Sequence, residues 1–276
     1  MSIAERHAGG RFLYGGHLRA NGIRQHYLRF GGTGVPLLVL PGITSPAATW
    51  DFVGETLATD RDVYVLDIRG RGLSSSGPEL RYDVDTCAND VLAFAASLGW
   101  QQWDLLGHSM GARIASRAAT SGPAGPRRLV LVDPPVSGPG RRAYPKPLDF
   151  YIEAIEQARA GTLEVEAVRR SYPKWTDAQV RARAEWLHTC TVEAVAQAHS
   201  DFHTHDFHAD LPRLRVPALL IVAGRGGVIL PADVEEIRAL QPAMEMRMLL
   251  EASHMVPFDD LPGFARATLE FLRAQG

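Results

Sequence analysis

The chain has 276 residues, of which 46% are hydrophobic, and its formal net charge is -2. This composition is typical of an ordinary globular protein, and it excludes a disordered or fibrous chain. No apolar run approaches the length of a membrane span, and the near-neutral charge provides no basic surface for nucleic acid. The length fits one α/β domain with an insertion, or at most two small domains.

The N-terminal stretch, residues 1–12, carries charges where a secretory signal needs an uninterrupted apolar segment. We therefore expect a cytoplasmic protein. The two cysteines, Cys87 and Cys190, are too few for a disulfide framework and too far apart for a metal knuckle. Cys87 is expected in the core.

An antiparallel hairpin is predicted at residues 16–30. Asn21 and Gly22 lie there between two strand-like runs, and this dipeptide readily takes the positive φ angles of a type I′ turn. The hairpin is therefore expected to open the domain.

Continuous apolar runs recur along the rest of the chain, as expected for strands buried on both faces of a sheet. Between two of them, apolar residues from Val84 to Leu98 are spaced three and four apart, which indicates an amphipathic helix. This alternation predicts an α/β fold: a mostly parallel sheet with helices on both faces. The runs are residues 35–42, 63–72, 103–111, 128–135, 216–224 and 243–254, and a last helix is predicted from residue 260 onward.

Residues 141–212 interrupt the alternation. They contain helix-like stretches around 151–160 and 178–189 without a buried-strand run between them, and the Gly, Pro and Arg content of 138–147 is typical of a hinge. We interpret them as a helical cap inserted into one α/β core. The predicted division is core residues 1–140, cap residues 141–212 and core residues 213–276.

The sequence Gly107-His108-Ser109-Met110-Gly111 fits the G-x-S-x-G pattern of a nucleophilic serine. It follows a predicted strand and opens a predicted helix. A serine on such a tight turn needs small neighbours, so that the chain can pass beneath it and expose Oγ at the carboxyl edge of the sheet. Taken alone, the pattern also fits an ordinary glycine-rich turn after a strand, with no catalytic role.

A serine hydroxyl needs an adjacent base, and His254 follows the last predicted strand, from where a loop can return it to the carboxyl edge. Asp133 follows the strand before the cap and can reach Nδ1 of that histidine, fixing its tautomer. The turn after the next-to-last strand holds no carboxylate, while Asp233 lies where a helix begins and is typical of a cap. We favour Asp133 as the orienting acid, with Asp233 as the alternative.

Acyl transfer also requires donors directed at the developing oxyanion. We predict the backbone amides of Met110, just after the serine, and of Ile43, in the turn after the 35–42 strand. Asp67 opens the segment Asp-Ile-Arg-Gly-Arg-Gly-Leu-Ser, whose aspartate and arginine are predicted to hold a loop rather than contact substrate.

Residues 199–208 contain four histidines and two aspartates, a composition that invites a zinc reading. Their spacing does not match the H-x-H-x-D-H pattern of metallo-β-lactamase-like hydrolases, and the segment ends the cap instead of following a strand. We predict neither a metal nor another cofactor.

Several stretches resemble the N-formylmaleamate deformylase group of the α/β-hydrolase superfamily, enzymes of aerobic nicotinic acid degradation. The resemblance implies a metal-free serine triad that maps onto Ser109, Asp133 and His254, and hydrolysis of N-formylmaleamate to maleamate and formate. The stretches are ANGIRQHYLRFGG, PGITSPAATW, LDIRGRGLSSSGP, LLGHSMGAR, LVLVDPPVSGPGRRAYP, RAEWLHTC and VAGRGGVI.

The small anionic amide substrate that this resemblance implies requires a cationic or donor-rich partner for its carboxylate, and arginine binds such groups bidentately. The candidates are Arg183, Arg225 and the cap histidines, with His205 taken to represent the histidines. The sequence does not choose among them, nor does it determine the oligomeric state.

Two other functions fit the same residues. A carboxylesterase or carbon–carbon bond hydrolase of aromatic ring-cleavage products would use the same triad, and only cap contacts would distinguish it. A hydrolase-like protein that binds a small ligand without chemistry is the alternative that is not an enzyme.

Overall fold

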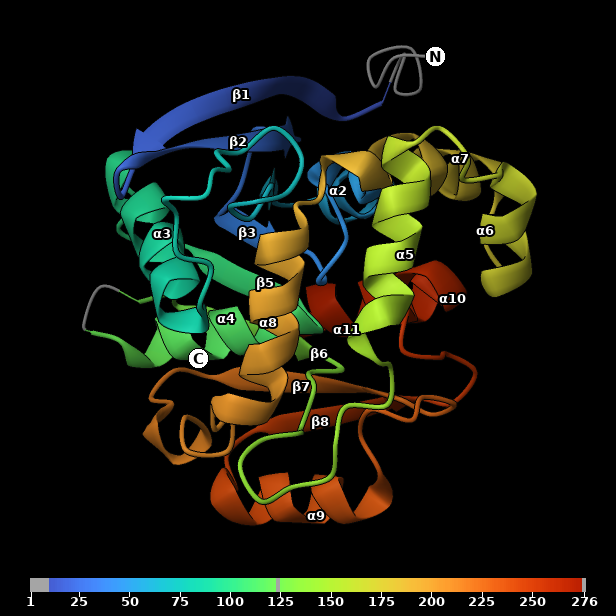
Figure 1. Cartoon of the computed structure of the whole chain (residues 1–276). Helices are drawn as coiled ribbons and strands as arrows, with labels where there is room; N and C mark the ends of the chain where they lie inside the picture. Colours follow the sequence, from blue (N-terminus) through green and yellow to red (C-terminus); the bar gives the residue numbers. More distant parts are fainter. Residues whose placement is uncertain (1–9, 123–124, 275–276) are drawn as a thin grey trace.

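A single mixed sheet of eight strands forms the centre of the molecule, in the order β1-β2-β4-β3-β5-β6-β7-β8. The computed structural model describes residues 10–122 and 125–274 (Figure 1). The pairs β1–β2 and β2–β4 are antiparallel and all other neighbours are parallel, so the predicted α/β class is confirmed. The strands are β1 (Phe12–Ala20), β2 (Ile23–Phe30), β3 (Pro36–Leu40), β4 (Asp62–Leu66), β5 (Asp104–His108), β6 (Arg128–Val132), β7 (Ala218–Ala223) and β8 (Glu245–Leu249).

The central strands are buried on both faces, which explains their continuous apolar sequences. Side chains alternate between two cores: in β6, Leu129 and Leu131 pack on one face while Val130 and Val132 pack on the other.

Helices cover both faces of the sheet. Residues of α3, α4 and α9 contribute to one core, and residues of α2, α10 and α11 contribute to the other. Each group carries the apolar stripe that such burial requires. The bounds are α2 (Asp51–Leu57), α3 (Val84–Ser97), α4 (Met110–Thr120), α9 (Pro231–Leu240), α10 (Val256–Asp259) and α11 (Leu261–Arg273), with a short 3-10 turn η1 (Ala47–Thr49) before α2.

The opening hairpin turns at Asn21 and Gly22, with φ angles of 49° and 75°. Both values are positive, as the predicted type I′ turn requires.

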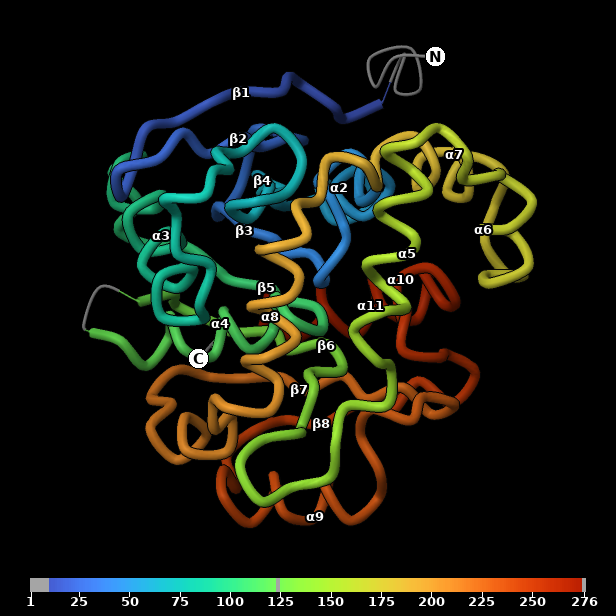
Figure 2. Tube along the Cα trace, in the orientation of Figure 1, coloured from blue at the N-terminus to red at the C-terminus, as the bar shows by residue number. Residues whose placement is uncertain are grey.

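The segment between β6 and β7 contains helices in place of strands. In the tube of Figure 2 it leaves the sheet after β6, runs from green through yellow to orange, and returns to β7. Its helices contact both cores: α5 and α8 supply residues to one, and α6 and α7 to the other. The bounds are α5 (Leu148–Arg159), α6 (Val165–Ser171), α7 (Asp177–Trp186), η2 (Leu187–Thr189), α8 (Val192–Thr204) and η3 (Leu211–Arg213).

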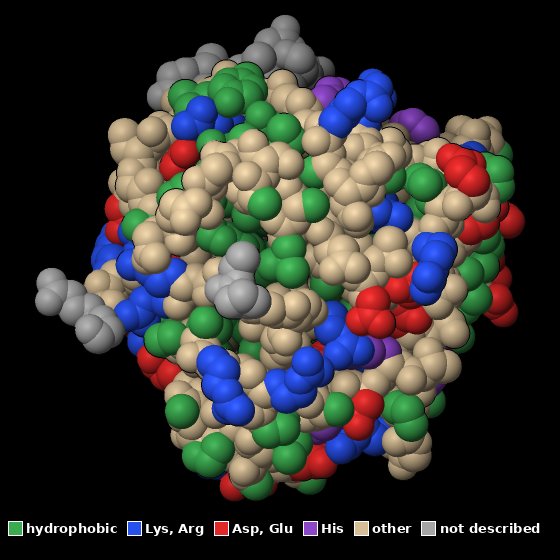
Figure 3. Space-filling model, turned by 90° about the vertical axis from the view of Figure 1, so that its left-hand side faces the viewer, with side chains coloured by type: hydrophobic (Ala, Val, Ile, Leu, Met, Phe, Trp, Pro, Cys, Tyr) green, Lys and Arg blue, Asp and Glu red, His purple; other side chains and the backbone are tan. Residues whose placement is uncertain are grey.

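Basic and acidic side chains are interspersed on the face shown in Figure 3, in keeping with the small net charge of -2. No helix within the described residues is long and apolar enough to cross a membrane. Most of the N-terminal stretch used above to argue against a signal peptide lies outside the described residues.

Candidate active site

Ser109 occupies the turn between β5 and α4 with φ 54° and ψ -119°, a backbone conformation that costs free energy for any residue with a side chain. Hydrogen bonds impose it: the Ser109 amide donates to the Val132 carbonyl at 2.9 Å, and its carbonyl accepts from Ala112 at 3.0 Å. The turn therefore fixes the direction of the Ser109 side chain.

Gly107 and Gly111 make this turn sterically feasible. A Cβ atom on Gly107 would overlap the Gly111 carbonyl, and one on Gly111 would overlap the Leu40 carbonyl at the end of β3. The small residues of the predicted pattern thus allow β3, β5 and α4 to approach one another beneath the serine.

His254 and Asp133 complete a hydrogen-bonded series with Ser109. The His254 Nε2 atom lies 2.9 Å from Ser109 Oγ, and its Nδ1 lies 2.7 Å from Asp133 Oδ2. In the tautomer with a proton on Nδ1, His254 donates to Asp133 and accepts from the serine hydroxyl. Asp133 is fully buried, and its other oxygen accepts from the Ala223 amide at 3.2 Å.

Asp133 also has a positive φ, 44°, directly after β6. Among the described residues only three other than glycine have a positive φ, and Ser109 and Asp133 are two of them. Backbone strain of this kind is concentrated at functional sites.

Asp233, the alternative acid, lies elsewhere. Its carboxylate accepts from the Leu230 amide at 2.6 Å at the start of α9 and pairs with Arg142 at 2.6 Å. The Arg142 and Leu230 donors outweigh burial and lower the pKa of Asp233. It therefore caps a helix and does not reach His254.

His108 supports the loop that carries His254. Its Nε2 donates to the His254 carbonyl oxygen at 2.8 Å. Burial, together with the adjacent His254, lowers the pKa of His108 to about 3, so this ring is neutral near pH 7. Asp259, at the end of α10, accepts from the Ser253 amide of the same loop at 2.7 Å.

The amides of Ile43 and Met110 lie on the two turns next to Ser109, after β3 and at the start of α4. Within residues 10–122 and 125–274, neither amide has an acceptor. Ile43 lines the cavity described next, as do its neighbours Gly42 and Thr44. Two unused donors beside the serine are what an oxyanion requires.

A cavity of about 630 Å³ opens over Ser109 and His254. The segment between β6 and β7 contributes eleven of the lining residues, and five of these are aromatic. The walls include four Lys or Arg residues but only one carboxylate, that of Asp259. These four cationic residues are Lys146, Lys174, Arg183 and Arg225.

Arg183 and Arg225, both predicted as carboxylate partners, line the cavity but differ in their contacts. Arg183, on α7, is 8% exposed and donates to the Thr44 carbonyl and, at 2.9 Å, to Thr44 Oγ1. Among the described residues it has no carboxylate partner. Arg225 is more exposed and pairs with Glu251.

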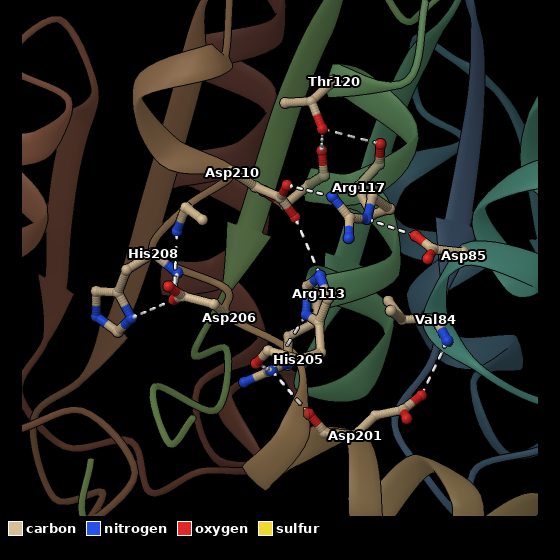
Figure 4. Close-up of polar contacts among 12 residues, drawn as sticks. Val84, Asp85, Arg113, Arg117, Thr120, Asp201, His205, Asp206, His208 and Asp210 are labelled. Atoms are coloured by element: carbon tan, nitrogen blue, oxygen red, sulfur yellow. Dashed lines mark hydrogen bonds and ion pairs between the residues drawn. The ribbon is translucent and has the colours of Figure 1, made fainter. Parts of the chain in front are cut away.

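His205 does not line the cavity, so the expectation that it contacts the substrate is wrong. It ends α8, where its ring packs between Arg113 and Asp210, with its Nε2 3.5 Å from the Asp210 carboxylate (Figure 4). The sequence pattern could not show this because it cannot tell which side of the cap a helix end faces. Among the described residues no group of three His, Cys, Asp or Glu residues could hold a metal ion.

Tyr144 and Tyr151 were not foreseen from the sequence as site residues. Both line the cavity, and their hydroxyl oxygens lie 3.3 Å apart. Burial raises the pKa of Tyr144, although hydrogen bonding with Tyr151 and Ser109 opposes the shift. Burial also raises the pKa of Tyr151, so both phenols remain proton donors at neutral pH. In the sequence, only the aromatic content of the segment between β6 and β7 pointed to these two residues.

Comparison with known proteins places these features in context. Residues 35–261 match the model of the alpha/beta hydrolase fold. N-formylmaleamate deformylase of Pseudomonas putida is 57% identical over 261 residues, which is 95% of this chain and 97% of that protein. The crystal structure of the N-formylmaleamic acid deformylase of Pseudomonas putida S16 superposes with a TM-score of 0.88 at 50% identity, covering 92% of this chain and all of that one.

A more distant solved structure, an E-2-(acetamidomethylene)succinate hydrolase, has 22% identity and a TM-score of 0.77 over 95% of this chain and all of that one. At that identity the similarity concerns the fold.

Proposed function

The chain belongs to the α/β-hydrolase family and is a hydrolase, and we propose that it deformylates N-formylmaleamate, giving maleamate and formate in nicotinate degradation. The observation that carries this proposal is the hydrogen-bonded series from Asp133 through His254 to Ser109, which ends in a cationic cavity. The relative that is 57% identical over almost the whole chain supports the choice of substrate.

In the proposed first half-reaction, Ser109 Oγ attacks the formyl carbon while His254 Nε2 takes the hydroxyl proton. Asp133 holds the imidazole in the required tautomer and stabilises the imidazolium. The negative charge on the former carbonyl oxygen is held by the amides of Ile43 and Met110. His254 then protonates the leaving nitrogen, the carbon–nitrogen bond breaks, and maleamate departs.

In the second half-reaction, water attacks the formyl ester on Ser109 while His254 takes one of the water protons. The same two amides hold the second oxyanion, and the proton returns from His254 to Ser109 Oγ as formate leaves. The cavity gives water access to the ester without any rearrangement of the triad.

The proposed substrate suits this chemistry. Its scissile nitrogen lies between two carbonyl groups, so the leaving group is an amide, which is less basic than an amine. A serine triad can expel it without metal assistance.

For the substrate carboxylate we propose Arg183 as the principal partner. Its guanidinium is held by Thr44, next to the proposed oxyanion amide of Ile43, and it has no carboxylate partner in the described part of the chain. A held, unneutralised arginine is the better ligand because little further ordering is needed on binding. Arg225 is already paired with Glu251, Lys174 Nζ donates to the Glu251 carbonyl at 2.9 Å, and Lys146 Nζ lies 4.9 Å from the centre of the Phe150 ring.

We further propose that residues 141–212 act as a cap that supplies the aromatic walls and Arg183, on a core made of residues 1–140 and 213–276. The proposed reaction takes place in the cytoplasm on a small anionic amide and requires no metal.

The direct test measures formate release from N-formylmaleamate by the purified chain, with Ser109→Ala as the control. Wild type is expected to release formate rapidly, and the variant to lose activity by at least about 10⁴-fold. Absence of formate with retained, Ser109-dependent cleavage of an activated ester would reject the substrate and keep the serine hydrolase.

A second measurement separates catalysis from binding alone. A fluorophosphonate that labels serine nucleophiles is expected to modify wild type at Ser109 and to leave Ser109→Ala unlabelled. Failure to label the native protein would favour a small-ligand binding protein.

A further inference from the structure

Arg71 is a buried cation next to the site that the proposed reaction does not use. It is 1% exposed and lies in the turn that begins with Asp67. Its Nε donates to the Ile43 carbonyl at 3.0 Å, and one terminal nitrogen donates to the Arg69 carbonyl at 2.9 Å. The other terminal nitrogen lies 3.4 Å from Met110 Sδ and donates to the Ala194 carbonyl at 2.9 Å.

These contacts join three separate segments. Ile43 lies on the loop after β3, Met110 begins α4, and Ala194 is in the first turn of α8. The Thr191 amide also donates to the Gly70 carbonyl at 2.9 Å, and a Cβ atom on Gly70 would overlap Ala194. The turn of Arg71 thus touches the start of α8 and both residues whose amides are proposed to hold the oxyanion.

No carboxylate neutralises this guanidinium in the described part of the chain; its partners are carbonyl oxygens and a thioether. Burying an unpaired charge is costly, and an arginine does not escape the cost by losing its proton. The remaining arginine of the turn, Arg69, by contrast pairs with Asp90 at 2.5 Å. The two arginines of one turn therefore differ: one is neutralised and the other retains an uncompensated charge.

We propose that Arg71 is a positioning residue for the oxyanion site. It fixes the Ile43 and Met110 segments relative to each other and supplies a permanent positive field where negative charge develops. A preorganised charge in a low-dielectric interior stabilises a transition state without reorganising during the reaction. This inference rests on the proposed serine mechanism but not on the identity of the amide substrate.

The test uses the full chain and an activated ester, p-nitrophenyl acetate, together with a boronic acid that forms a tetrahedral adduct on the serine. Arg71→Met removes the charge and keeps much of the volume, whereas Arg71→Lys keeps the charge with fewer donors. Arg113→Met is the matched control. Arg113 is also a buried guanidinium that donates to backbone carbonyls, those of Asp201 in α8, of His205 just after it, and of Pro135 and Ser137. It has no hydrogen bond with Ile43 or Met110 among those of the described residues.

Arg71→Met is expected to lower kcat by about 10- to 100-fold and boronate affinity by a similar factor, with KM within about threefold of wild type. Arg71→Lys should recover most of the lost kcat, and Arg113→Met should change kcat by less than about threefold. A kcat for Arg71→Met within threefold of wild type overturns the proposal. So does a lower kcat with unchanged boronate affinity, or an equal loss in Arg113→Met.

Arg71→Gln is measured if Arg71→Met does not fold, because it keeps a donor for Ile43 and lacks the charge. A wild-type kcat for Arg71→Gln overturns the role of the charge, and a loss restored in Arg71→Lys supports it. If wild type cleaves the ester through Ser109 but not N-formylmaleamate, only the proposed substrate fails and the Arg71 test stands. If ester cleavage does not depend on Ser109, the serine mechanism and the role of Arg71 fail together.

Discussion

Three regions of the described structure pair a histidine with a buried aspartate, and two of them, those of Asp133 and Asp210, show how much the surroundings matter. At the carboxyl edge of the sheet, His254 bonds Asp133 at 2.7 Å and turns its other nitrogen to Ser109 in an open cavity. Just after α8, His205 lies 3.5 Å from Asp210, whose carboxylate also accepts from Arg117 at 2.8 Å (Figure 4). We call this second group of residues, Arg113, Arg117, His205 and Asp210, the α8 polar cluster.

The comparison teaches that a histidine and an aspartate do not make a catalytic site by themselves. In the α8 polar cluster the aspartate is neutralised by Arg117, and Arg113 donates to the carbonyl of His205. Asp133 has only backbone and His254 as hydrogen-bond partners within the described residues, so its charge is available to the imidazole. Two features therefore decide which histidine–aspartate pair performs chemistry: whether substrate can reach the histidine, and whether the third residue of the group is a serine nucleophile or an arginine.

The largest expected effect comes from Asp133→Asn. The amide would hold His254 in the wrong tautomer, so kcat should fall by about 10⁴-fold. Steady-state kinetics on N-formylmaleamate or an activated ester would measure this. Near-native turnover in Asp133→Asn would contradict the assigned role.

Asp210→Asn is the counterpart in the α8 polar cluster. Asp210 is fully buried and pairs with Arg117, which also pairs with Asp85. Losing the charge-assisted hydrogen bond to Arg117 should lower the free energy of unfolding by about 2 kcal/mol. Urea unfolding at pH 7 would measure the loss, while kcat of the folded protein should stay within about twofold of wild type. A large drop in kcat at unchanged stability would show that Asp210 serves catalysis and not the stability of the fold.

Arg183→Met tests the cationic cavity. Loss of a charge-assisted hydrogen bond to the substrate carboxylate should raise KM by about 10- to 100-fold with a smaller change in kcat. Arg225→Met serves as the matched control, since its partner is Glu251, and KM should change by less than about threefold. The assignment of Arg183 is wrong if the two variants behave alike.

The smallest effect is expected from Asp233→Asn, which keeps an oxygen acceptor for the Leu230 amide but removes the negative charge at the start of α9 and the ion pair with Arg142. The cost should be about 1 kcal/mol, with kcat unchanged. The pKa of Asp233 is lowered in the folded protein, so its contribution to stability is present above the ordinary value of 3.8. That contribution is lost as pH falls through the lower, folded-state value. Urea midpoints of wild type and variant should therefore differ at pH 7 and converge once the pH is below the folded-state pKa of Asp233; a constant gap would argue against an ionised carboxylate at this position.

Much of the fold follows from local sequence. The apolar runs became β3 to β7 because a strand buried on both faces has no polar side to alternate with. The less regular run before His254 formed β8, whose residues are partly exposed at the edge of the sheet. Helices α2, α6 and α8 were not predicted, because short or polar segments there become helical through tertiary contacts.

The sequence by itself determined the nucleophile turn, the order of serine, aspartate and histidine, and the hairpin at Asn21, because each depends on neighbours along the chain. Tertiary structure alone decided that Thr44 holds Arg183 at the cavity wall, that His205 lies outside the cavity, and that Arg71 contacts both Ile43 and Met110. These depend on how α7 and α8 pack against the core, and packing brings together residues more than 100 positions apart, such as Arg71 and Ala194. A pattern of neighbouring residues carries no information about a contact between residues so far apart in the sequence.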